Sequence, residues 1–477
     1  MTLIALTHYF HNKMKITFGG DAIKKIPIDA VRVHFVESST VPFLEHNDGR
    51  RELNIKTGKY SAVTQRSFIL LCRKVVRLAQ EHKINRVAIL FDREPFSQLK
   101  SLSDFEVASL MVQNFEMANF EFTTFRTKPK SGWPKVKEVI IYGEVDAHVK
   151  AGFKKGQVIG EYVNKCRELA NAPGGDMTPT ALAEEAKKTA RGTKIKVTAL
   201  GPKELKKLKM GAILGVARGS KEEPCFIIME YNGGGKEKPI VLIGKGVTFD
   251  TGGLSLKPSD SMVGMHLDMS GGAAVINTIA LAAKLGVKKN IIGLVPAVEN
   301  MPGGESYRPG DVLVSMSGKT IEVLNTDAEG RVILADALTY ARKYNPRLVV
   351  DVATLTGAAL IALGQRTSAF MTKEKKFEDL FVKLGEESGD YMWPLPLWDE
   401  YEEEVRGSRG DVTNTHNKNS RYGGSINGGI FLHEFARGLP WVHIDIAPRM
   451  EAIPSDNLAP GAAGEPVRFL LKLVENF

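Results

Sequence analysis

Cysteine is scarce in this 477-residue chain, which contains only Cys72, Cys166 and Cys225. Three thiols so far apart in the sequence do not form a disulfide framework, and their spacing does not match a thiolate zinc site. Disulfides persist mainly in oxidising compartments, so a chain with so few cysteines is typical of a reducing one. We therefore expect a cytoplasmic protein.

Long hydrophobic runs are missing as well. No stretch approaches the roughly 18 consecutive apolar residues that a membrane-spanning helix requires, and residues 1–14 have no basic segment before their short apolar run. We expect neither a membrane span nor a signal peptide. With 43% apolar and 25% charged residues, a chain of this length is expected to fold into two or three domains with substantial cores.

Several catalytic signatures are also absent. The segment "HEFAR" (433–437) has Arg437 where the helix of a single-zinc protease requires its second histidine. Phe249 stands at the third glycine position of a dinucleotide-binding pattern that would start at Gly244, and the spacing of a phosphate-binding P-loop is missing. No GxSxG nucleophile elbow occurs. These three classes of enzyme are therefore unsupported.

Positive charge is concentrated in the front third of the chain. Residues 1–150 contain 23 Lys and Arg against 16 Asp and Glu, and so carry most of the formal net charge of +9. A basic surface of this kind could bind nucleic acid. The basic residues are dispersed, however, and no helix-turn-helix or RNA-binding signature accompanies them, so a solvated face is the simpler interpretation. DNA binding by this region is kept as the alternative function.

Strand and helix patterns alternate along the chain. In the front third, segments 30–37, 86–91 and 136–143 predict strands, and segment 66–82 predicts an amphipathic helix. A long helical pattern then ends at "NAPGGD", and a new helix is expected after Thr178 as N-cap, with Pro179 in the first helical position. Apolar strands separated by helices predict a mostly parallel central sheet flanked by helices. We predict an α/β protein with a smaller N-terminal α/β domain at 1–150, a connecting helix at 151–172 and a larger C-terminal α/β domain at 173–477.

In such sheets, functional side chains gather in loops that follow the carboxyl ends of the strands. Three loops here carry both acidic and basic side chains, at 243–260, 265–274 and 323–338. Together they contribute four carboxylates and three cations, namely Asp250, Asp268, Asp327 and Glu329 with Lys245, Lys257 and Arg331.

Most of these residues have a purely structural alternative. Asp327 or Thr326 could cap the helix that follows, with Glu329 in its first turn, and Asp268 could cap the next helix in its own loop. Asp250 is different, because it lies in a glycine-rich turn after a buried strand, where a bare carboxylate loses hydration. Four converging carboxylates repel one another unless divalent cations neutralise them. We therefore predict a metal site.

The chemistry of these side chains suits a pair of ions. Two divalent ions about 3.5 to 4 Å apart favour hydrolysis, since they acidify a shared water and polarise a carbonyl. The seven residues include no histidine or cysteine, so the ligands are hard oxygens with at most one lysine amine, which fits Zn²⁺, Mn²⁺, Mg²⁺ or Co²⁺. Lys245 could bind an ion only as the neutral amine, whereas Lys257 and Arg331 would stay charged and could stabilise an oxyanion.

The segments "NTDAEGR" (325–331) and "GKGVTFDTGGLSLKP" (244–258) resemble motifs of the cytosol or leucyl aminopeptidase family, the two-metal M17 peptidases. Segments 168–184, 351–358, 393–401 and 441–447 also match, so the resemblance covers residues 160–477. It implies a catalytic metallopeptidase domain at 173–477 and a variable, oligomerisation or regulatory domain at 1–150. The implied activity is the release of N-terminal residues, leucine and other mainly apolar amino acids, from peptides.

The resemblance also implies a role for each residue. One ion would be bound by Lys245, Asp250, Asp268 and Glu329, and a more exchangeable one by Asp250, Asp327 and Glu329. The two ions would be Zn²⁺ or Mn²⁺. Lys257 would polarise the scissile carbonyl, and Arg331 would hold a bicarbonate ion that acts as the general base. The substrate-binding residues would be Met265, Asn325, Thr354, Leu355 and Gly357, and the assembly would be a homohexamer, a dimer of trimers.

Overall fold

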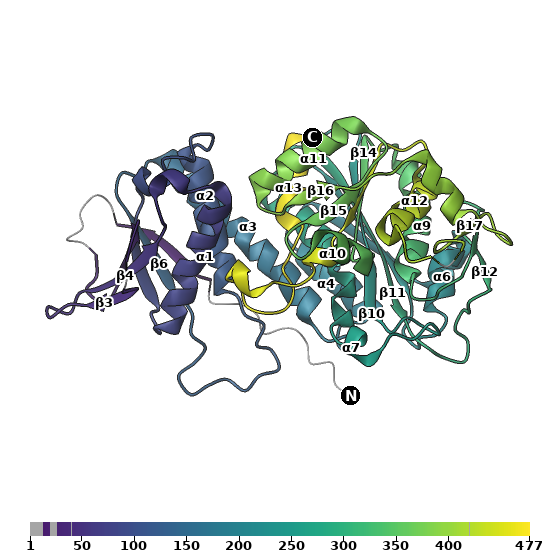
Figure 1. Cartoon of the computed structure of the whole chain (residues 1–477), viewed down its shortest axis with the longest axis horizontal. Coiled ribbons are helices and arrows are strands. Elements are labelled where there is room, and N and C mark those ends of the chain that lie inside the picture. Colours follow the sequence, from purple (N-terminus) through teal and green to yellow (C-terminus); the bar gives the residue numbers. More distant parts are fainter. Residues whose placement is uncertain (1–12, 20–25, 40, 419) are drawn as a thin grey trace. The chain divides into compact units, whose positions relative to one another are not determined.

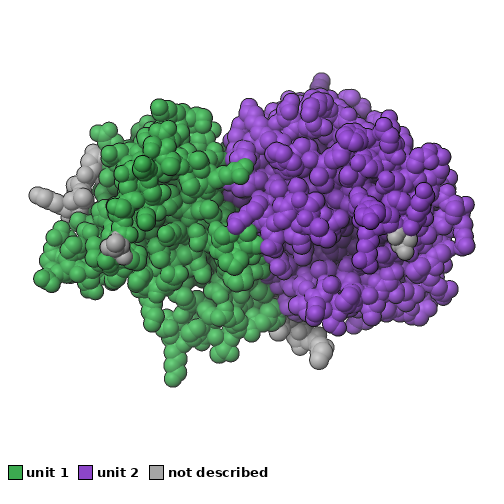
Figure 2. All heavy atoms as spheres, in the orientation of Figure 1, with its two compact units in different colours: residues 1–164, 452–461 green, residues 165–451, 462–477 purple. Residues whose placement is uncertain are grey.

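The computed structural model (Figure 1) describes residues 13–19, 26–39, 41–418 and 420–477, so most of the opening segment 1–14 lies outside the described residues. The chain divides into two compact units (Figure 2). Unit 1 comprises Met1–Asn164 and Ala452–Gly461, and unit 2 comprises Lys165–Glu451 and Ala462–Phe477. Among the described residues, no helix has the length and apolar character needed to cross a membrane.

Unit 1 is built on a six-stranded sheet with strand order β1-β6-β5-β2-β4-β3, in which all neighbours are parallel except β3 and β4. The predicted strands at 30–37, 86–91 and 136–143 are confirmed as β2, β5 and β6. The six strands are β1 (Lys15–Phe18), β2 (Val31–Val36), β3 (Phe43–Glu45), β4 (Arg51–Lys56), β5 (Arg86–Leu90) and β6 (Glu138–Tyr142).

The helices of unit 1 begin at side-chain caps. The helix predicted at 66–82 is confirmed as α1 (Gln65–Glu81), which starts at a capping box between Thr64 and Ser67. Ser103 and Glu106 form the same motif before α2 (Asp104–Asn119). These two helices pack against each other, and α3 (Ala147–Asn171) follows β6.

Unit 2 contains a nine-stranded sheet with strand order β16-β15-β18-β14-β9-β11-β8-β7, and β10 also pairs with β11. The pairs at its centre are parallel, which confirms the predicted fold class. Antiparallel pairs lie further out. The strands are β7 (Ile195–Leu200), β8 (Cys225–Asn232), β9 (Ile240–Gly244), β10 (Gly246–Asp250), β11 (Asn290–Asn300), β14 (Leu348–Ala353), β15 (Ser368–Met371), β16 (Met392–Pro394) and β18 (Trp441–Asp445).

Helices cover both faces of this sheet (Figure 1). Helices α6, α9 and α12 pack together over one face, where they share a buried apolar core with β9, β11 and β14. Helix α8 packs on the other face with α4 and α13. The helices are α4 (Pro179–Ala190), α5 (Pro202–Lys207), α6 (Gly211–Ala217), α7 (Ser259–Met262), α8 (Ser270–Leu285), α9 (Glu329–Ala341), α10 (Gly357–Leu363), α11 (Lys375–Ser388), α12 (Gly424–Ala436) and α13 (Val467–Asn476).

Two local features complete unit 2. The predicted start of α4 is confirmed, because the Thr178 side chain accepts a hydrogen bond from the Ala181 amide and Pro179 is the first helical residue. A separate three-stranded sheet contains β12 (Val312–Val314), β13 (Thr320–Glu322) and β17 (Val412–Thr413).

The parallel strands end at one edge of the large sheet. Strands β9, β10, β11, β14 and β18 run in the same direction, so the residues at or just after their carboxyl ends gather there. These residues are Lys245, Asp250, Asn300, Thr354 and Asp445.

Candidate metal centre

Lys245 lies at the junction of β9 and β10, and its side chain is buried among acids. The ammonium Nζ is 2.7 Å from Asp268 Oδ2 and 2.8 Å from Glu329 Oε1. It also donates to the Thr354 carbonyl at 3.0 Å. Gly330 makes this approach possible, because a Cβ at that position would lie 2.6 Å from Lys245 Cε. The lysine thus joins the carboxylates of two different loops.

Lys257 makes a second set of ion pairs at the same sheet edge. Its Nζ is 2.8 Å from Asp250 Oδ2 and also pairs with Asp327 Oδ1. Gly252 shapes the turn between Asp250 and Lys257. It has a positive φ of 85°, and its amide donates to Asp250 Oδ1 at 2.8 Å.

The four predicted carboxylates therefore converge on two lysine ammonium groups. Asp250, Asp327 and Glu329 each offer one oxygen within 4.8 Å of the others. Such a set of hard oxygen donors fits divalent cations. Lys245 Nζ lies as an ammonium beside Asp268 and Glu329, the acids predicted to share an ion with it.

The helix-cap alternatives are wrong. Helix α9 begins at Glu329, its N-cap is Ala328, and no side chain caps it. Helix α8 has Met269 as its N-cap, again without a side-chain cap, and Asp268 lies in the preceding 3-10 helix Met265–Met269. Instead, Asp268 pairs with Lys245 and Asp327 pairs with Lys257.

The electrostatics of the cluster reflect its burial and crowding. Burial, together with repulsion from Glu329 and Asp250, raises the pKa of Asp327 to about 7. Burial opposes the charge of Lys245, but attraction by Asp268, Glu329 and Asp250 outweighs it and raises the lysine pKa. The same balance raises the pKa of Lys257. Excess negative charge at this edge therefore favours additional cations.

Arg331 is buried two residues after Glu329. Its Nη1 donates to the Asn414 carbonyl at 2.9 Å, while its Nε has no hydrogen-bond partner within the described part of the chain. Burial lowers the pKa of Arg331 to about 10, and the charges of Glu329 and Asp445 partly offset that effect. A buried guanidinium with an unused donor can bind an anion.

The predicted substrate residues lie around the same edge. Thr354 Oγ1 donates to Asp268 Oδ1 at 2.6 Å, and the Leu355 amide donates to Asp445 Oδ1 at 3.0 Å. Asn325 accepts a hydrogen bond from the Asp327 amide at 2.8 Å. Met265 is half-buried at the start of its 3-10 helix. Gly357 is exposed, and a Cβ there would meet no atom within 4 Å.

Several residues that the sequence did not single out lie at this edge. Asn300 contacts Asp250. Tyr307 Oη donates to the Thr326 carbonyl at 2.7 Å. The Asn414 side chain accepts from the amide of Leu324 at 2.8 Å. Asn300 ends a buried strand, as Asp250 does, so the strand-end argument could have found it.

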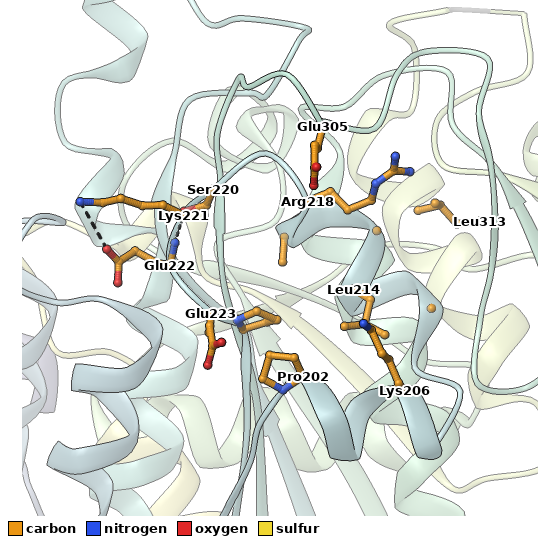
Figure 3. A pocket seen from close by; sticks show the side chains of 14 residues that line it. Pro202, Lys206, Leu214, Arg218, Ser220, Lys221, Glu222, Glu223, Glu305 and Leu313 are labelled. Atoms are coloured by element: carbon orange, nitrogen blue, oxygen red, sulfur yellow. Dashed lines mark hydrogen bonds and ion pairs between the residues drawn. The ribbon is translucent and has the colours of Figure 1, made fainter.

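A separate pocket of about 480 Å³ lies beside α5 and α6 (Figure 3). None of the predicted site residues lines it. Its charged side chains are Lys206, Arg218, Lys221, Glu222, Glu223 and Glu305, and Lys221 forms an ion pair with Glu222 at 3.7 Å. This pocket is therefore distinct from the carboxylate cluster.

Comparison with known proteins identifies the class to which this fold and cluster belong. Residues 164–471 match the model of the cytosol aminopeptidase family, catalytic domain. The chain is 39% identical over 429 residues to a probable cytosol aminopeptidase of Paraburkholderia phymatum, covering 89% of this chain and 83% of that protein. A probable cytosol aminopeptidase of Burkholderia pseudomallei is 39% identical over 427 residues, with the same coverage.

A solved structure has the same fold as this chain. The bottromycin maturation enzyme BotP in complex with Mn superposes with a TM-score of 0.84 at 29% sequence identity, covering 94% of this chain and 99% of that chain. The chain belongs to the cytosol aminopeptidase family, as its motifs predict. It is a metal-dependent aminopeptidase. The matches give no support to DNA binding as an alternative function.

Proposed function

We propose that the carboxylate cluster binds two divalent ions and uses them to remove the N-terminal residue of peptides. Lys245, Asp250, Asp268 and Glu329 would hold one ion. Asp250, Asp327 and Glu329 would hold the other, with the Asp327 carbonyl in reach. The observation that carries this proposal is the convergence of four carboxylates from three loops on two buried ammonium groups.

The ions are proposed to be Zn²⁺ or Mn²⁺. When bound, they would supply an acidified water and a polarised carbonyl, which is what two-metal hydrolysis requires. The presence of Mn in the BotP complex supports manganese as one candidate.

Lys257 and Arg331 would act on the reacting groups. Lys257 remains charged beside Asp250 and Asp327, so its ammonium can stabilise negative charge that develops on the scissile carbonyl oxygen. Arg331 would hold bicarbonate as the general base for the attacking water. The unused Nε of its buried guanidinium supports an anion at this position.

The substrate is proposed to enter with its free amine at the ions, which restricts cleavage to the chain terminus. Met265, Asn325, Thr354, Leu355 and Gly357 would surround the first residue. The adaptable Met265 side chain and the open space at Gly357 favour leucine and other apolar side chains.

We further propose that the protein works in the cytoplasm as a homohexamer, a dimer of trimers. Residues 1–150 would form the variable oligomerisation or regulatory domain, 151–172 the connecting helix and 173–477 the catalytic domain. Light scattering should give a mass about six times the 52.3 kDa of one chain. A mass near that of one chain would contradict the assembly.

The function is tested with a pair of substrates that differ only at the amine. Chelator-stripped protein reloaded with Mn²⁺ should hydrolyse leucine p-nitroanilide and leave N-acetyl-leucine p-nitroanilide intact. Excess chelator should abolish turnover. Equal cleavage of the blocked substrate, or turnover that is insensitive to chelator, would refute the proposed exopeptidase.

A further inference from the structure

Asn300 is an uncharged side chain in the middle of the carboxylate cluster. It is the last residue of β11, it is fully buried, and the parallel register places it opposite Asp250 of β10. Its Nδ2 donates to Asp250 Oδ1 at 2.8 Å and to the Thr326 carbonyl at 3.0 Å, and lies 3.5 Å from Glu329 Oε2. One amide group therefore touches the two acids proposed to bridge the ions.

The two oxygens of each bridging acid have different surroundings. Asp250 Oδ1 accepts from Asn300 and from the Gly252 amide, while Oδ2 faces Lys257 at 2.8 Å. Glu329 shows the same arrangement, with Oε2 near Asn300 and Oε1 facing Lys245 at 2.8 Å. In Asp250, uncharged donors hold one oxygen and a cation lies at the other. In Glu329, the Asn300 amide is a more distant neighbour of one oxygen, at 3.5 Å, and a cation lies at the other.

Asp268 repeats this pattern with a different partner. Its Oδ1 accepts from Thr354 Oγ1 at 2.6 Å, and its Oδ2 faces Lys245 at 2.7 Å. The pattern is therefore shared by three of the four acids. Asn300 is the side chain that lies beside two of these acids, Asp250 and Glu329.

A side-chain amide is suited to contact one oxygen of a metal-binding acid, because it donates hydrogen bonds without carrying charge. A lysine or arginine in its place would neutralise the acids and weaken their attraction for metal ions. An aspartate would lose the donor and add a fifth negative charge. Hydrogen bonds to the outer oxygen of a ligand fix its orientation toward the ion.

We propose that Asn300 is a positioning residue that presents Oδ2 of Asp250 and Oε1 of Glu329 to the bound ions. This inference rests on the proposed metal binding. It assigns to Asn300 no contact with the substrate or the ions.

The test compares Asn300→Leu, which keeps the size but removes the donor, with Tyr307→Phe. Tyr307 donates to the same Thr326 carbonyl as Asn300, so its variant removes a neighbouring hydrogen bond and leaves those of the acids in place. Mn²⁺ affinity of the chelator-stripped full chain is measured by isothermal titration calorimetry. We expect affinity to fall about 10- to 100-fold in Asn300→Leu and to stay at the wild-type level in Tyr307→Phe.

Turnover at saturating Mn²⁺ gives a second readout. Misplaced ligands should lower kcat while KM for leucine p-nitroanilide changes little, and a cooperative thermal melting curve should show that the metal-free variant is folded. A folded Asn300→Leu with wild-type Mn²⁺ affinity would overturn the inference. Failure of the wild type to bind Mn²⁺ would instead refute the proposed metal centre.

If Asn300→Leu does not fold, the wild type itself supplies the test. In a crystal structure of the Mn²⁺-loaded chain, the ions should contact Asp250 Oδ2 and Glu329 Oε1 while Asn300 still contacts Asp250 Oδ1. Ions bound to Asp250 Oδ1 would overturn the inference.

Discussion

Thr326 and Ser255 form a reciprocal pair of hydrogen bonds between two loops that are 71 residues apart in the sequence. The Ser255 amide donates to Thr326 Oγ1 at 2.7 Å, and the Thr326 amide donates to Ser255 Oγ at 3.1 Å. Thr326 Oγ1 also donates to the Gly252 carbonyl at 2.6 Å. These hydrogen bonds connect the loop that carries Asp250 and Lys257 to the loop that carries Asp327.

Thr326→Val should loosen this connection. The variant leaves the half-buried Ser255 amide and the buried Gly252 carbonyl without this partner, and an unsatisfied buried group costs about 1 to 3 kcal/mol. We expect a lower melting temperature and a fall in kcat/KM of tenfold or more, on the order expected when reacting groups are misplaced by a fraction of an ångström. Thr339→Val is the matched control, because Thr339 Oγ1 donates within its own helix α9, to the Ala335 carbonyl. Similar losses in both variants would contradict the role of the loop connection.

Lys257→Met should impair the chemical step. The substitution keeps the length of the side chain and removes the charge beside Asp250 and Asp327. We expect kcat to fall about a hundredfold or more, the scale for loss of transition-state stabilisation, with little change in KM. Lys206→Met, at the separate pocket of Figure 3, is the control. A Lys257→Met enzyme with near-normal kcat would remove this residue from the mechanism.

Gly357→Phe should change the preference for the first residue. The glycine is exposed and its Cβ direction is open, so the fold should accept a side chain there. If Gly357 borders the pocket for the first side chain, phenylalanine narrows it, and cleavage of leucine p-nitroanilide should fall by about 10- to 200-fold relative to the alanine analogue. Gly357→Ala should have an intermediate effect. An unchanged ratio of kcat/KM for the two substrates would place the pocket elsewhere.

Glu116→Gln should alter the pH dependence of stability. Glu116 is buried in α2, where it accepts a hydrogen bond from Gln157 Nε2 at 2.7 Å. Burial raises its pKa from 4.5 to about 8. Between these pH values the folded state holds a proton that the unfolded state has lost, so stability decreases as the pH rises from about 4.5 through about 8.

The variant removes this ionisation. Its melting temperature should exceed that of the wild type by a margin that grows between pH 5 and pH 9, as followed by scanning calorimetry. Glu184→Gln, at an exposed residue paired with Lys187, is the control and should show no such trend. A margin that is constant with pH would show that Glu116 does not titrate as described.

The sequence predicts the acidic and basic residues of the site because they follow apolar strands in recognisable loops. The sequence also leaves open whether Asp268 and Asp327 cap helices. An aspartate just before a helix is expected both for an N-cap residue and for a metal ligand at the end of a loop. Only the helix starts at Ser270 and Glu329 decide between them. Asn300 also ends a buried strand, but its contact with Asp250, 50 residues away, is set by the register of β10 and β11, which the sequence does not give. The grouping of residues 452–461 with unit 1 likewise has no signal in composition.

The proposed hydrolysis depends on cations bound by the four carboxylates. Equilibrium dialysis of the chelator-stripped chain against Mn²⁺, with leucine p-nitroanilide turnover measured on the same samples, tests it most directly. We predict two ions per chain, activity that rises as they bind, and loss of both binding and activity in Asp250→Ala. Full turnover by a metal-free chain, or two tightly bound ions in Asp250→Ala, would show that these carboxylates do not bind the catalytic ions.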